Sequence, residues 1–112
     1  MPGTIKRTFG PLALTNTTTT NIYNNASALI YDVIRHIHVV NKTASPATFS
    51  LWLGATGANA AGTELYNGQV VAANSVFDAY LTLKMTSTDF LVGGASANTT
   101  LTIEGEGEQY VV

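Results

Sequence analysis

Two histidines one residue apart are the residues of this chain whose spacing best suits chemistry. His36 and His38 are the only histidines among 112 residues and stand in the run IRHIHVVN. In an extended strand both side chains point to one side, about 6.5–7 Å apart along the strand. A metal ion bound there would need further ligands, such as Asp32 or Glu64, and no pattern fixes where those carboxylates lie.

A His-x-His pair on a strand is similar to the motif of the cupins, jelly rolls that bind a metal through two such histidines, a carboxylate and a more distant histidine. This chain has no third histidine. We therefore expect no bound metal, with a cupin-like metal-binding protein as an alternative. In the preferred interpretation Arg35, Ile37 and Val39 define the opposite face of the strand. The two histidines then lie on the outer face, where they can hydrogen-bond another subunit.

Three carboxylates form a second pattern near the end of the chain. Glu104, Glu106 and Glu108 alternate with Gly105 and Gly107, so the carboxylates share one side of an extended strand. Calcium needs several oxygens within about 2.6 Å, and carboxylates spaced along a straight strand do not converge on one ion. We expect a solvated face or a contact with basic residues of a neighbouring chain, for which Lys6 and Arg7 are the candidates. The glycines suggest close packing or a bulge on the other face.

The remaining residue types argue against catalysis. The chain has no cysteine and no G-x-S-x-G motif, so thiol and nucleophilic-serine sites of the known patterns are missing. We expect no enzyme and no cofactor. Trp52 and the five tyrosines are able to stack on sugars, which keeps a carbohydrate-binding module as a further alternative.

Composition limits the partners of this protein. Only 11% of the residues are charged and the net charge is −2, with five basic residues. Nucleic acids and anionic membranes are bound mainly through clustered Lys and Arg, so we expect neither partner. The beginning of the chain lacks the apolar core of a secretory signal, and no run is long enough to span a membrane. We expect a soluble intracellular protein that assembles with copies of itself, since little charge repels them.

Short strand-like runs separated by Gly, Asn, Ser and Pro describe the whole chain. Residues 47–54 and 76–85 alternate cleanly between apolar and polar side chains. Seven to eight such runs without helical periodicity predict an all-β, antiparallel β-sandwich of jelly-roll type, as a single domain over residues 1–112. Residues 1–25 are expected to form an N-terminal arm or an edge segment.

The alternating runs also predict a core and several turns. Gly10-Pro11 and Ser45-Pro46 should turn the chain, the latter within a hairpin, and Asn67-Gly68 is a hairpin signal. The predicted inward-facing residues are Phe49, Leu51, Leu53, Phe77, Leu81, Leu83, Leu101 and Ile103.

Residues 33–54 (VIRHIHVVNKTASPATFSLWLG) and 62–85 (GTELYNGQVVAANSVFDAYLTLKM) together resemble small β-sandwich virion proteins of tailed bacteriophages. This resemblance implies a structural protein of the virion. The leading hypothesis is a capsid decoration (cement) protein that binds the major capsid protein, as a trimer, and stabilises the head shell. A tail or fibre subunit, bound to another virion protein, is the alternative within this group.

Overall fold

The chain forms eight β-strands and no helix over residues 3–112, the part that this computed structural model describes. The all-β prediction is therefore confirmed. The strands are β1 (Thr4–Ala13), β2 (Asn21–Tyr23), β3 (Ile30–Asn41), β4 (Ala47–Gly54), β5 (Glu64–Val71), β6 (Ser75–Met85), β7 (Phe90–Ala95) and β8 (Leu101–Val111).

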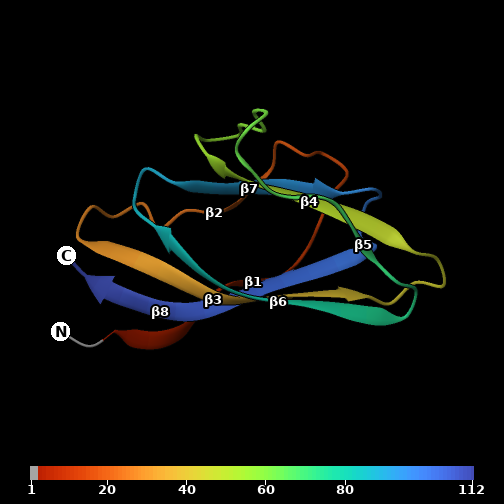
Figure 1. Cartoon of the computed structure of the whole chain (residues 1–112), viewed down its shortest axis with the longest axis horizontal. Helices are drawn as coiled ribbons and strands as arrows, with labels where there is room; N and C mark the ends of the chain where they lie inside the picture. Colours follow the sequence, from red (N-terminus) through yellow and green to blue (C-terminus); the bar gives the residue numbers. More distant parts are fainter. Residues whose placement is uncertain (1–2) are drawn as a thin grey trace.

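Two antiparallel sheets of four strands face each other as two layers (Figure 1). The first sheet has the strand order β1-β8-β3-β6, and the second sheet has the order β2-β7-β4-β5. Consecutive strands lie in different sheets, except β4 and β5, which pair with each other. Most connections therefore cross from one layer to the other.

The connection from β3 to β4 is one of these crossings, so the hairpin predicted around Ser45-Pro46 is wrong. β3 pairs with β6 and β8, whereas β4 pairs with β5 and β7. The buried Asn41 side chain organises the crossing. Its amide nitrogen donates to the carbonyls of Ser45 and Val71, at 2.9 and 3.1 Å, and its oxygen accepts from Thr43 N at 2.9 Å. These bonds tie the end of β3 to the second sheet.

Two further turn signals lie inside strands. Gly10-Pro11 falls within β1, which continues to Ala13 with register shifts on both sides of Phe9. Asn67-Gly68 falls within β5, which has one extra residue relative to β4 at this point. Gly68 has a φ of 63°, and its N–H donates to Ser50 Oγ at 2.9 Å. The predicted hairpin is therefore a β-bulge, a feature that glycine favours because it adopts positive φ without strain.

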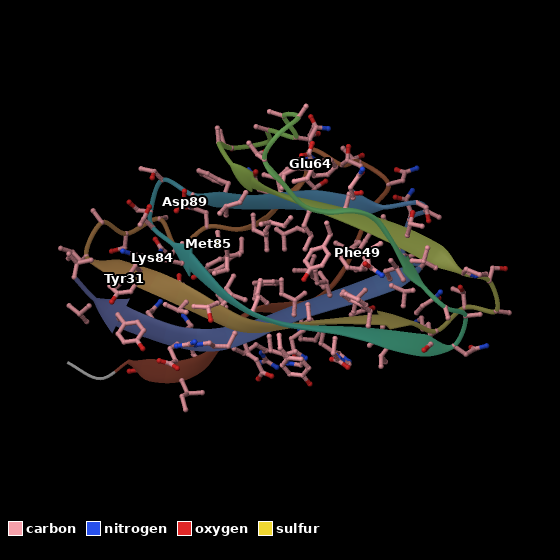
Figure 2. All side chains as sticks on the ribbon, in the orientation of Figure 1. Tyr31, Phe49, Glu64, Lys84, Met85 and Asp89 are labelled. Atoms are coloured by element: carbon pink, nitrogen blue, oxygen red, sulfur yellow. The ribbon has the colours of Figure 1, made fainter. Side chains whose placement is uncertain are left out.

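The space between the layers is filled by apolar side chains from both sheets, and Figure 2 shows Phe49 and Met85 pointing into it. The alternating runs predicted this inner face correctly, since all eight predicted residues belong to the core or pack against it. The fully buried members are Phe49, Leu51, Leu101 and Ile103, and the partly buried ones are Leu53, Phe77, Leu81 and Leu83.

The segment near the N-terminus is hydrogen-bonded to both sheets of its own chain. β1 is an edge strand of the first sheet, pairs with β8 of the same chain, and buries Phe9 in the core. The polar segment after it follows β7, because Thr15 O and Thr20 O accept from Ala95 N and Gly93 N at 2.8 and 3.0 Å. Two parts of this segment, β1 and β2, are thus the edge strands of the two sheets.

Candidate functional site

The outer face of the first sheet, which points away from the core, carries both histidines. His36 lies opposite Tyr80 of β6 and Glu106 of β8, and His38 lies opposite Asp78 of β6. The two imidazole rings are 6.0 Å apart between centroids. The pleat of β3 thus brings together side chains from three neighbouring strands.

Arg35 is also on this outer face, so its predicted position on the opposite face is wrong. β3 has one extra residue relative to β8 between Ile34 and His36. This bulge reverses the alternation: Ile34 and Ile37 are both fully buried, and the two residues between them both point outward. Arg35 Nη1 donates to Thr82 Oγ1 at 3.1 Å.

The His36 ring is held between two carboxylates. Its Nδ1 lies 2.8 Å from Glu106 Oε1, and its Nε2 lies 2.8 Å from Asp78 Oδ1. A ring nitrogen donates only when it carries a proton, so a ring that donates to both carboxylates is the imidazolium. The hydrogen bond to Glu106 raises the pKa of His36, and the bond to Asp78 adds to this effect against the opposing effect of partial burial.

Asp78 joins the two histidines through a single oxygen. Its Oδ1 lies 2.8 Å from His36 Nε2 and 2.5 Å from His38 Nδ1. The hydrogen bond from His38, followed by that from His36, lowers the pKa of Asp78. One donor atom from each of the three residues lies within 4.8 Å of the others. Two imidazoles and one carboxylate at this spacing are a set that transition metals bind.

Tyr80, the cross-strand partner of His36 on β6, stacks its ring on the His36 imidazole. The two rings are stacked, with centroids 4.6 Å apart and planes inclined by 5°, although Tyr80 itself is 79% exposed. An open depression of about 350 Å³ lies beside this pair. Its lining is formed by Ile5, Arg35, His36, Tyr80, Glu106, Gly107 and Glu108.

The carboxylates named from the sequence as possible metal ligands lie elsewhere. Asp32 is completely buried and accepts hydrogen bonds from Tyr23 Oη at 2.6 Å and Asn25 Nδ2 at 3.1 Å. Glu64 begins β5 of the second sheet (Figure 2), where its carboxylate accepts from Gly62 N at 2.9 Å. The carboxylate that does lie beside both histidines is Asp78. The sequence did not single it out, although the alternation of residues 76–85 already placed Asp78 on the outer face.

The three glutamates of β8 share this outer face, and two of them have partners within the chain. Glu106 contacts His36, and Glu108 accepts from the Tyr110 hydroxyl and lies 3.5 Å from Arg35 Nε. Of the basic candidates, Arg7 lies opposite Glu106 and Lys6 lies opposite Gly107 in the pairing of β1 with β8. These candidate interface residues are therefore neighbours in one molecule.

The two glycines between the glutamates allow neighbouring groups to approach the backbone of β8. A Cβ at position 105 would overlap the Phe9 ring, and a Cβ at position 107 would overlap the Val33 carbonyl oxygen. This is the close packing that the sequence suggested. It holds β8 against β1 and β3, and so places Glu106 beside His36.

Neither a scan against protein-family models nor a search of curated proteins finds a match for this chain. Within residues 3–112, the structure contains no helix with the length and apolar character needed to cross a membrane.

Proposed function

We propose that this protein is a structural subunit of a bacteriophage virion, a capsid decoration protein that binds the major capsid protein and stabilises the head shell. The family resemblance of residues 33–54 and 62–85 is the starting point. The observation that carries the proposal is the outer face of the first sheet. Exposed Tyr80 and Ile5, at 79% and 85% exposure, stand there among fixed charged side chains. An ordered face with an exposed aromatic residue is suited to docking on another protein.

The strand order supports a jelly roll as the finer description of the sandwich. The first and last strands, β1 and β8, are neighbours in one sheet, and β2 and β7 are neighbours in the other. Eight strands paired in this nested way in two sheets are expected for a jelly roll built from two Greek keys. This architecture occurs among viral capsid proteins, which agrees with the proposed class.

The end of the molecule that carries the last residues of β8 supports self-association. Leu29, Val111 and Val112 are 73%, 62% and 80% exposed, and Val112 N donates to Leu29 O at 2.8 Å, so these apolar side chains belong to one region. Exposed apolar groups that lie together favour contact with another chain. We propose that copies of the protein meet here in a trimer on the shell.

Mass analysis of purified phage particles tests the proposed function. A decoration protein should be present in the head fraction at a copy number comparable with that of the major capsid protein. A tail or fibre subunit would be found at low copy number in the tail fraction instead. Absence of the protein from both fractions would contradict a role as a virion structural protein.

A further inference from the structure

We propose that His36, His38 and Asp78 form a binding site for one divalent first-row transition-metal ion such as Zn²⁺. This site is independent of the virion proposal, because it rests on the donor atoms themselves. All three side chains are accessible from solvent, with 18%, 33% and 31% of the side chain exposed. An ion can therefore reach them without rearrangement of the backbone.

The pairing of β3 with β6 sets the donor geometry. Asp78 lies directly opposite His38, and His36 is two residues further along the same face. The three donor atoms lie within 4.8 Å of one another, and the shortest separations are 2.5 and 2.8 Å. A tetrahedral zinc ion about 2.0–2.2 Å from its ligands separates them by about 3.4 Å. The two nitrogen–oxygen separations are shorter than this value by about 0.9 and 0.6 Å, and the third separation is at most 4.8 Å, so small side-chain rotations are enough to seat the ion.

The donor types select the class of metal. Imidazole nitrogen suits zinc, copper, nickel and iron, whereas calcium and magnesium prefer a complete set of oxygen ligands. Two imidazoles and one carboxylate leave at least one coordination position for water or another ligand, as in open zinc sites. The ion would take the place of the two N–H protons that now point from His36 Nε2 and His38 Nδ1 to Asp78 Oδ1. His36 would release its Nε2 proton to solvent and keep the Nδ1 proton that faces Glu106, and the metal-bound His38 ring would carry its single proton on Nε2.

Two neighbours fix the orientation of the His36 ring in the way that is usual for a histidine that binds a metal. Glu106 Oε1 lies 2.8 Å from Nδ1 and accepts the proton there, which leaves Nε2 directed at Asp78. A carboxylate in this position fixes the tautomer of a ligating histidine and increases its basicity. The stacked Tyr80 ring restricts the imidazole plane in addition. Glu106 and Tyr80 are thus positioning residues for the proposed site.

Calorimetric titration with zinc chloride tests this proposal. The full chain is stripped with a chelator, dialysed and titrated in parallel with variants whose fold is checked by circular dichroism. We expect one zinc ion per wild-type chain. His38→Gln and Asp78→Asn should each weaken binding about tenfold or more, and Glu106→Gln about 10–100-fold. Glu108→Gln is the matched control, since this carboxylate lies on the same strand and face but contacts Arg35 and Tyr110; its affinity should equal that of the wild type.

Two results would overturn the proposal. One is the absence of zinc binding by the wild type at about 1 mM zinc. The other is binding that His38→Gln and Asp78→Asn leave unchanged, because the ion would then lie elsewhere on the chain. If Asp78→Asn fails to fold, the comparison of Glu106→Gln with Glu108→Gln decides, and equal affinities for these two variants would also contradict the site.

Discussion

Replacing Gly107 by alanine should strongly destabilise the protein. Gly107 lies in β8 opposite Ile34, next to the bulge at Arg35. A Cβ at this position would overlap the Val33 carbonyl oxygen and stand 3.0 Å from Arg35 N. Both are backbone atoms of the neighbouring strand, so no side-chain rotation relieves the clash. β8 would have to move away from β3 and weaken the ladder between them.

The magnitude follows from these two effects. Overpacking costs about 1–3 kcal/mol, and each weakened ladder bond adds about 0.5–1.5 kcal/mol. We therefore expect a loss of about 3 kcal/mol, a large part of the roughly 5–15 kcal/mol that stabilises a domain. The melting temperature should fall by about 10 °C or more.

Urea unfolding followed by the fluorescence of Trp52, the single tryptophan, measures this loss, since Trp52 is only 9% exposed. Gly54→Ala is the matched control. Gly54 also lies in a strand, but no atom stands within 4 Å of the position that a Cβ would take there, so its effect should stay within about 0.5 kcal/mol. A Gly107→Ala variant as stable as Gly54→Ala would refute the described packing of β8 on β3.

Two further predictions concern stability. Phe49→Ala removes a ring that is 1% exposed in the core and should cost about 3–5 kcal/mol in thermal unfolding; a loss below about 1 kcal/mol would contradict the inner face assigned to β4. The second concerns pH in metal-free buffer. The pKa of His36 is raised in the folded protein, so its contribution to stability is complete below the unfolded pKa of about 6.5 and is lost as pH rises through the folded value. The pKa of Asp78 is lowered in the folded protein. Asp78 therefore contributes to stability above pH 3.8, its ordinary pKa, and this contribution is lost as pH falls through the folded pKa. His36→Gln should therefore destabilise the protein more at about pH 5.5 than at about pH 9 in urea unfolding, and an equal effect at both would argue against the imidazolium.

Local patterns predicted the strands but not their assignment to sheets. Residues 47–54 and 76–85 alternate because each strand has one face on the core and one on its exterior, and this period is visible in sequence. Whether the turn at 45–46 joins two strands of one sheet depends on the distant strands with which β3 and β4 pair, and the bond from Asn41 to Val71 of the second sheet is one contact of this long-range kind. That contact joins residues 30 positions apart and leaves no local signal.

The candidate site was only partly predictable, because the sequence shows alternation within a strand but not the pairing between strands. The alternation placed His36 and His38 on one face and Asp78 on an outer face, but the register that sets Asp78 against His38 arises only when β3 and β6 pair. The position of Arg35 was not predictable from its own strand. The bulge that turns it outward depends on the close approach of Gly107 in β8, more than 70 residues away in the chain.

Binding to stripped phage particles tests most directly whether the outer face of the first sheet docks on the capsid. Co-sedimentation compares the wild type with Tyr80→Ala, which removes an exposed ring of that face, and with Val70→Ala, which changes a 56% exposed side chain of the second sheet. We predict that Tyr80→Ala remains folded and loses affinity about tenfold or more, whereas Val70→Ala binds as the wild type does. Equal binding of Tyr80→Ala and the wild type, or a loss confined to Val70→Ala, would contradict the docking face proposed for this protein.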